Sequence, residues 1–300
     1  MQQHEQSQVR PRRSVLYMPG SNARALEKAK SLDVDALIFD LEDAVDPEAK
    51  ELARDQVCTA VVQGGYGHRE LVVRINSLHS PLGQEDMLAV AKAQPDGVLV
   101  PKLEGPADVR QVLDVLDRLD GGKQIALWLM METPGSVLYA REIAEEARNA
   151  TRPVAAMVLG TNDLAKDTRA ALEAPRTGFL PWLMQCVVAA RYAGIDVIDG
   201  VFNQIGADDT FLAECEQGRN LGMDGKTLIH PSQIAAANAS FAPSEEEITW
   251  AGKVIAAFDA PENEGKGVLK VDGKMVELLH AQMGRRLIDL ATAIEMRRSG

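Results

Sequence analysis

Short runs of apolar and β-branched residues recur along the first three quarters of the chain, at intervals of about 20 to 35 residues. Most of them are bounded by Gly, Pro, Asp or Asn, as buried parallel strands tend to be. The pattern predicts eight strands: Ser14–Met18, Ala36–Phe39, Leu71–Ile75, Gly97–Val100, Ala126–Met130, Val154–Leu159, Asp196–Ile198 and Lys226–Ile229.

The stretches between these strands show helical spacing with charged faces. They include Asn22–Ser31, Asp46–Gln63, Ala107–Leu119 and Ser136–Asn149. A strand–helix alternation repeated eight times predicts an α/β fold of the (β/α)₈ TIM-barrel type rather than an open doubly wound sheet. A Gly-x-Gly-x-x-Gly motif follows none of the strands, which argues against a dinucleotide-binding site.

The pattern changes after Pro231. Gln233–Ala239 reads as a helix, and Ser244 with Glu247 forms a capping-box pattern at the start of another. A hairpin-like Val268–Lys274 follows, and a final helix is predicted from Met275 to Met296.

Three segments are therefore predicted. Residues 1–12 form a flexible N-terminal tail, and residues 13–239 form the catalytic barrel. Residues 240–300 are too short to hold an independent core, so we expect a C-terminal helical lid that packs on the barrel or on a neighbouring subunit.

Composition narrows the class of protein. The 300 residues carry a formal net charge of −12, which opposes binding to nucleic acid or to an anionic membrane. No apolar run approaches the roughly 18 residues that a membrane span needs, and residues 1–10 lack the apolar core of a signal peptide. The three cysteines are widely spaced, without zinc-site spacing, as is typical of a cytoplasmic protein.

Basic residues gather around the first strand. They are Arg12, Arg13, Arg24, Lys28 and Lys30. The cluster is either an anion-binding site or a solvated helix face, and the sequence does not choose between the two.

Polar residues follow every predicted strand. These strand ends are Pro19–Asn22, Asp40–Asp43, Arg74–Asn76, Pro101–Glu104, Glu132–Gly135, Gly160–Asp163, Asp199–Gly200 and His230–Pro231. In a barrel the carboxyl ends of all strands converge on one mouth, where active sites lie. We therefore predict an active site built from these side chains.

Two of these residues are suited to a metal ion. Glu132 and Asp163 lie at neighbouring strand ends and supply hard oxygen ligands, as Mg²⁺ prefers. Zinc is disfavoured because no His/Cys set has the required spacing. Arg74 is placed to bind a carboxylate or a developing enolate with its planar donor fork. Such a set suits carbon–carbon cleavage of a hydroxy or keto acid.

The acids after the second strand have several possible roles. Asp40 is expected to cap a loop, whereas Glu42 and Asp43 are candidate catalytic residues or orient Arg74 and Lys102. His230 is more often a hydrogen-bonded loop residue than a base.

Several segments resemble the citrate lyase β-subunit/malyl-CoA lyase family of the HpcH/HpaI aldolase superfamily. They lie in order from residue 13 to about residue 287. The segments are Arg13–Gly20, Phe39–Val45, Arg74–Asn76, Glu132–Pro134, Gly160–Leu164, Asp224–Pro231 and Asp272–Glu277.

The resemblance implies a TIM barrel with a C-terminal lid, in homo-oligomers such as trimers or hexamers. It implies that Arg74 and Glu132 contact substrate, and that Glu132 and Asp163 bind Mg²⁺. Tyr17, Asn22 and Lys28 match positions that contact the nucleotide end of CoA, although Asn22 stands where malyl-CoA lyases have Arg.

A second departure lies in the C-terminal segment. Some members place a catalytic Asp there, which reaches into a neighbour's site, and the matching residue in this chain is Glu277. The longer side chain keeps the carboxylate but shifts it by about an ångström, a displacement that can cost about 10²-fold in rate.

The sequence thus predicts a Mg²⁺-dependent lyase that cleaves a malyl-, citramalyl- or citryl-type thioester to acetyl-CoA and a 2-keto acid. Two alternatives stay open: a thioesterase with the same site, and a citrate lyase β-subunit that acts on a carrier-protein thioester with other subunits. A non-catalytic binding protein is the remaining alternative.

Overall fold

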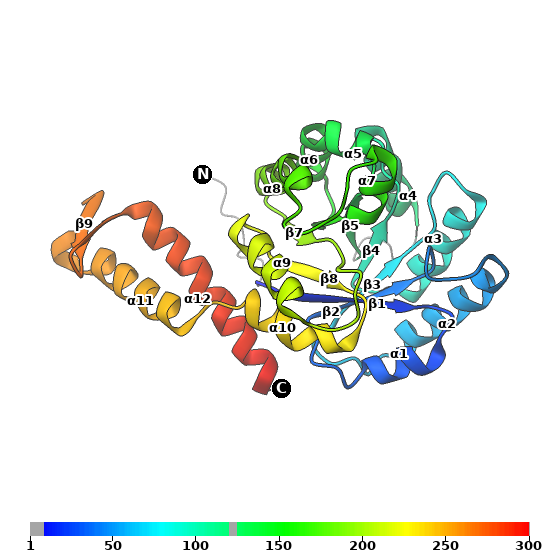
Figure 1. Cartoon of the computed structure of the whole chain (residues 1–300), viewed down its shortest axis with the longest axis horizontal. Coiled ribbons are helices and arrows are strands. Elements are labelled where there is room, and N and C mark those ends of the chain that lie inside the picture. The colour runs from blue at the N-terminus through cyan, green and yellow to red at the C-terminus, as the bar shows by residue number, and fades with distance from the viewer. Residues whose placement is uncertain (1–8, 120–124, 300) are drawn as a thin grey trace. The chain divides into compact units, whose positions relative to one another are not determined.

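The structure of the protein is a computed structural model that describes residues 9–119 and 125–299. It contains two compact units (Figure 1). One is Arg12–Phe241, and the other begins at Ala242 and includes residues 9–11. Residues 1–8 of the predicted tail lie outside the described residues.

The larger unit is a closed barrel of eight parallel strands, as predicted. Each strand pairs with the next in sequence, and β1 closes the barrel by pairing with β8. The strands are β1 (Ser14–Pro19), β2 (Ala36–Asp40), β3 (Glu70–Arg74), β4 (Gly97–Val100), β5 (Ala126–Met131), β6 (Val154–Leu159), β7 (Asp196–Asp199) and β8 (Gly225–Leu228).

Helices alternate with the strands and surround them (Figure 1). Outward-facing strand residues such as Leu37 and Phe39 pack against these helices in one large core. The helices are α1 (Ala23–Ala29), α2 (Lys50–Gln63), α3 (Pro81–Ala93), α4 (Pro106–Arg118), α5 (Pro134–Leu138), α6 (Ala140–Asn149), α7 (Thr161–Thr168), α8 (Leu180–Ala193), α9 (Asp209–Asn220) and α10 (Ile234–Ser240).

The alternation of side chains along each strand determines which residues reach the mouth. Ile38 and Asp40 of β2 lie two apart, and Ile38 belongs to the cluster that fills the barrel interior. Trp128 and Met130 of β5 belong to the same cluster, so Glu132 continues their inward-facing row just beyond the strand. An apolar interior thus ends in a layer of charged side chains.

The N-terminal ends of the strands form the opposite face. Arg12, which the sequence assigned to the tail, donates hydrogen bonds to Glu70 at 2.8 Å and to Asp196 at 2.7 Å. Arg13 forms a buried ion pair of 2.8 Å with Asp35. Neither alternative left open for the basic cluster holds for Arg12 and Arg13, because both side chains are largely buried and carboxylates distant in sequence neutralise them.

A buried ion cluster lies between the barrel wall and α9. Asp199 and Lys226 are register partners on β7 and β8, and their side chains approach within 3.1 Å. Lys226 also pairs with Glu214 of α9 at 2.6 Å, and Arg176 pairs with Asp199 at 2.9 Å. Asp199 therefore does not point into the mouth as predicted, since its neighbour Ile198 takes the inward position.

The smaller unit consists of α11 (Glu245–Asp259), a hairpin of β9 (Val268–Val271) and β10 (Lys274–Glu277), and α12 (Leu278–Ser299). The predicted capping box of Ser244 and Glu247 begins α11. None of the described helices is sufficiently long and apolar to cross a membrane.

The last helix begins later than predicted. Residues 274–277 continue the hairpin because Asp272 and Gly273 form its turn with φ angles of 46° and 82°, as a tight two-residue turn requires. Val276 also packs with Val254 of α11 in the small core of this unit.

Candidate active site

A cavity of about 320 Å³ opens at the mouth of the barrel, which is the lower end of the usual range for ligand pockets. Apolar side chains form part of its wall, namely Met130, Leu159, Val201 and Ile229. Its polar lining comprises Tyr17, Asp40, Asp43, Arg74, Glu132, Thr161, Asn162, Asp163 and Thr227. The residues predicted at the ends of four strands, β2, β3, β5 and β6, thus meet in one cavity.

Arg74 is held at the mouth by Asp40, its register partner on β2. Two guanidinium nitrogens of Arg74 donate to Asp40 at 2.7 and 2.6 Å, a bidentate pair with almost no exposure to water. The third nitrogen, Nη1, lies 3.1 Å from Glu42 Oε2. The Arg74 guanidinium also lies over the ring of Tyr17, 4.8 Å from its centroid. Arg74 therefore lines the cavity in a fixed position.

Asp40 also shapes the loop that carries the other acids. Its carboxylate accepts hydrogen bonds from the backbone N–H groups of Glu42 and Ala44 at 2.9 and 3.1 Å. The prediction that Asp40 caps a loop is correct. This turn brings Glu42 to the buried side and leaves Asp43 exposed, 3.7 Å from Arg74.

Glu132 is only 1% exposed and is fixed by its neighbours. Its Oε1 accepts the backbone N–H of Lys102 at 2.7 Å. Gly160, at the end of β6, approaches so closely that a Cβ there would lie 2.3 Å from the Glu132 Cβ. A glycine is thus required at position 160 for Glu132 to reach the mouth.

Asp163 lies in the first turn of α7, where backbone N–H groups favour a negative charge. Lys102 donates a hydrogen bond to Asp163 at 2.5 Å and lies 3.5 Å from Glu132, so one ammonium contacts both carboxylates. The two acids predicted to bind a metal therefore lie close together, in contact with the same lysine ammonium.

This donor set fits Mg²⁺. Two carboxylates at the mouth of an open cavity leave coordination positions for water and substrate, which is the usual arrangement for this ion. Within residues 9–119 and 125–299, no group of three or more His, Cys, Asp or Glu side chains is placed to hold a metal.

The mouth also shifts the acidity of its carboxyl groups. Burial raises the pKa of Glu42 to about 8, although Arg74 opposes the shift. Burial likewise raises the pKa of Glu132 to about 7, against the opposing effect of Lys102. Burial alone would raise the pKa of Asp163, but the hydrogen bond and the charge of Lys102, together with a hydrogen bond to Glu132 and the charge of Lys166, lower that pKa. The acids at the mouth thus differ in protonation near neutral pH.

A pH-dependent stability follows for the metal-free protein. The pKa of Glu42 is raised from an ordinary 4.5 to about 8, so between these values the folded state binds a proton that the unfolded chain has released. This contribution to stability is complete below pH 4.5 and is lost as pH rises through about 8.

In EDTA, Glu42→Gln should lose about 1–3 kcal/mol less stability between pH 5.5 and pH 8.5 than the wild type does. Urea unfolding measures the difference, with the exposed Glu48→Gln as control; equal losses in wild type and Glu42→Gln would contradict it.

Two predicted site residues of the barrel unit do not join this cluster, and a third belongs to the other unit. The side chain of Asn22 accepts the Ala25 N–H at the start of α1, and Lys28 is exposed on the same helix. Neither lines the cavity, whereas Tyr17, which was grouped with them, does. Glu277 ends β10 in the smaller unit, where it is exposed.

Lys102 is the residue that sequence reasoning undervalued. The sequence predicts Lys102 at the mouth and as a partner for Glu42 and Asp43, yet its ammonium contacts Asp163 and Glu132 more closely. Its place at the end of β4, among strand ends rich in carboxylates, was the available signal. His230 contacts Ser232 at 2.8 Å, as expected of a hydrogen-bonded loop residue.

Comparison with known proteins places this site in a family. The HpcH/HpaI aldolase/citrate lyase family model matches residues 13–231. A (3S)-malyl-CoA thioesterase of Cereibacter sphaeroides is 45% identical over 96% of this chain and 97% of its own length. The citrate lyase subunit beta of Escherichia coli is 34% identical over 91% of both chains.

A solved structure agrees with these relatives. CitE from Mycobacterium tuberculosis, in complex with magnesium and acetoacetate, superposes with a TM-score of 0.64 and 25% sequence identity. The match covers 78% of this chain and 91% of that protein. The chain, an enzyme with its charged cavity at the carboxyl ends of the barrel strands, belongs to the HpcH/HpaI aldolase/citrate lyase family.

Proposed function

We propose that this enzyme is a Mg²⁺-dependent carbon–carbon lyase that cleaves a small acidic 3-hydroxyacyl-CoA of the malyl, citramalyl or citryl type. The observation that carries the proposal is the pairing of two carboxylates, Glu132 and Asp163, with a fixed Arg74 around one cavity. The products are acetyl-CoA and a 2-keto acid.

Glu132 and Asp163 are the residues that would hold the metal. Bound there, Mg²⁺ supplies a Lewis acid for the oxygens of the hydroxy acid. The magnesium and acetoacetate in the similar CitE structure support this assignment.

Side chains of the protein stabilise or transfer the other charges that develop during cleavage. In the cleavage a base removes the hydroxyl proton, the carbon–carbon bond breaks, and its electron pair moves to the thioester as an enolate. Arg74 lines the cavity in a position fixed by Asp40, so its guanidinium is placed to stabilise the enolate oxygen. Glu42, whose pKa burial raises to about 8, is suited to exchange a proton with a bound substrate near neutral pH.

The enolate carbon must finally take up a proton. The family resemblance assigns this role to Glu277 of the C-terminal segment, which carries a carboxylate in place of Asp. Tyr17, Asn22 and Lys28 are assigned by the same resemblance to the CoA moiety. In this proposal, homo-oligomers complete the site through that segment.

A second function is favoured by one observation. The 45% identity to a (3S)-malyl-CoA thioesterase suggests that the same site hydrolyses the thioester, so that free malate and CoA are the products. The similarity to a citrate lyase subunit beta leaves a role on a carrier-protein thioester within a larger complex. Both alternatives use the same carboxylates and Arg74.

Product analysis distinguishes these functions. Purified protein should release acetyl-CoA and a keto acid from one member of a panel of malyl-, citramalyl- and citryl-CoA, and EDTA should abolish the release. Free hydroxy acid with CoA would instead identify a thioesterase. Inactivity on every CoA ester, with turnover of the carrier-protein thioester, would identify the subunit role.

A further inference from the structure

The Lys102 ammonium lies in the middle of the acidic residues of the mouth. Its Nζ is 2.5 Å from Asp163 and 3.5 Å from Glu132, and it is 4.0 Å from both Glu42 and Asp43. Four carboxylates from three other strand ends therefore surround one flexible cation. Burial alone would lower the pKa of Lys102, but these carboxylates outweigh it and keep the group charged.

The backbone that delivers this side chain is strained. Lys102 has a φ of 55°, in the left-handed region that a lysine rarely adopts. Of the five non-glycine residues with positive φ in the described part of the chain, the other four are at helix ends or turns: Gln94, Arg169, Arg176 and Asp272. Lys102 follows a barrel strand instead, and its N–H is held by Glu132. Strain that surrounding contacts maintain at a site is a reason to look for a function.

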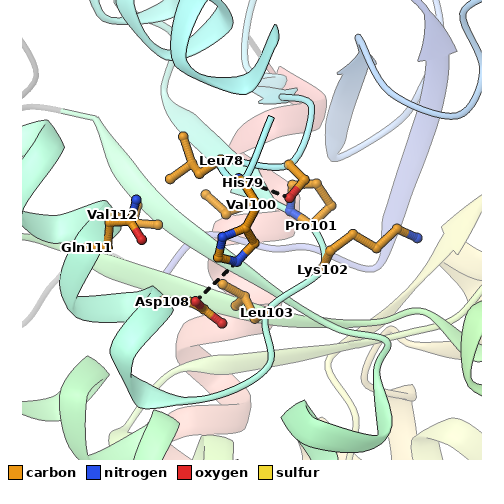
Figure 2. Close-up of a pocket in the computed structure, with 10 residues that line it drawn as sticks. Leu78, His79, Val100, Pro101, Lys102, Leu103, Asp108, Gln111 and Val112 are labelled. Atoms are coloured by element: carbon orange, nitrogen blue, oxygen red, sulfur yellow. Dashed lines mark hydrogen bonds and ion pairs between the residues drawn. The ribbon is translucent and has the colours of Figure 1, made fainter. Parts of the chain in front are cut away.

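The loop around Lys102 is anchored on its far side. Pro101 and Leu103 are buried beside a small cavity of about 10 Å³, which His79 and Asp108 close with a 3.3 Å contact. Figure 2 shows the Lys102 side chain extending away from that cavity. The main chain beside Lys102 is therefore packed on one side, and its side chain extends to the carboxylates of the mouth.

A cation bound by Glu132 and Asp163 and the Lys102 ammonium would occupy the same space between the two carboxylates. They repel each other, so one must leave. A second position for the ammonium already exists, because Glu42 and Asp43 lie 4.0 Å away. The 4.0 Å contact is with Glu42 Oε1, because Oε2 is already paired with Arg74 Nη1 at 3.1 Å.

We propose that Lys102 is a positioning residue that exchanges between two carboxylate pairs. It holds Glu132 and Asp163 together in the metal-free enzyme and moves to Glu42 and Asp43 when a divalent cation binds. In the metal-free enzyme the ammonium thus competes with an incoming cation for Glu132 and Asp163. In the metal-bound enzyme the ammonium orders Glu42 and Asp43. This inference rests on the metal site of the proposed function.

The test is a calorimetric titration of the purified protein with MgCl₂ alone, without any thioester. Lys102→Met and Lys102→Gln remove the competing charge, and each should bind Mg²⁺ roughly tenfold more tightly than the wild type. Lys102→Arg keeps the charge and should bind within about threefold of the wild type. The rise in melting temperature caused by Mg²⁺ should be larger in both neutral variants than in the wild type, and circular dichroism verifies their fold.

The direction in which the Mg²⁺ affinity changes in the neutral variants decides whether the exchange of Lys102 is accepted or rejected. Unchanged or weaker binding by the folded neutral variants would overturn the exchange, as would a wild type that binds no Mg²⁺. Tighter binding in both neutral variants, together with no turnover of any thioester, would support the exchange and refute the proposed lyase.

Discussion

Glu132→Gln and Asp163→Asn should each lower Mg²⁺-dependent turnover by at least about 10³-fold while leaving the fold intact. Each change replaces an anionic oxygen donor with a neutral amide, which binds Mg²⁺ poorly. The fold should survive, because a glutamine at position 132 still offers an oxygen to the Lys102 N–H, and Asp163 is part-exposed in the first turn of α7.

The measurement is kcat with the preferred thioester at saturating Mg²⁺, with circular dichroism and a melting curve for each variant. Asp167→Asn is the matched control, since it removes a carboxylate of the same helix from a position that does not line the cavity. A folded Glu132→Gln enzyme that retained a tenth of the wild-type rate would refute the metal assignment.

Lys226→Met should destabilise the protein by about 3–5 kcal/mol, because it breaks a buried ion cluster and leaves charge behind. Lys226 and Asp199 are both fully buried, and Lys226 also neutralises Glu214. Without the lysine, Arg176 alone faces two carboxylates, at 2.9 Å from Asp199 and 3.5 Å from Glu214. The loss should appear as a lower urea midpoint.

Lys253→Met provides the comparison for this result. Lys253 pairs with Asp272 on the surface of the smaller unit, where both side chains are about half exposed. Exposed pairs contribute at most about 1 kcal/mol, so the midpoint should hardly move. Similar midpoints for Lys226→Met and the wild type would mean that Asp199 and Glu214 are neutralised by other means.

The barrel was predictable because its determinants are local. Each strand is a short apolar run with punctuating residues on both sides, and the parallel arrangement then brings Arg74, Glu132 and Asp163 to one end. The identity of the polar residues at those ends was thus sufficient to find the mouth. The sequence did not predict whether an individual side chain points into the mouth or away from it.

Asp199 illustrates this limit. It ends β7 as Asp40 ends β2, yet Asp40 faces the mouth and Asp199 faces α9. Ile38 and Ile198 both fill the interior of the barrel. Asp40 lies two residues after Ile38 and therefore points the same way, whereas Asp199 directly follows Ile198 and points the opposite way. Counting positions from a known interior residue would have separated them, but the sequence does not mark which residue that is.

Long-range pairing was hidden for a different reason. Arg12 finds its partners 58 and 184 residues away, at Glu70 and Asp196, so no local pattern indicated that it would be neutralised. The start of α12 was misplaced because Met275 and Glu277 are good helix formers, whereas the turn at Asp272 and Gly273 and the packing of Val276 favour a strand. Tertiary contacts decided both cases.

The close approach of Gly160 to Glu132 limits how this enzyme can be redesigned. A library that seeks a new acyl preference can vary the bulk of Val201 or Ile229, since these side chains line the cavity and belong to neither core cluster of the barrel. Position 160 has to stay glycine in such a library, because a single added methyl would collide with Glu132 and displace it. By the same logic, a related sequence that keeps both acids but carries a larger residue at this position would be a candidate pseudoenzyme.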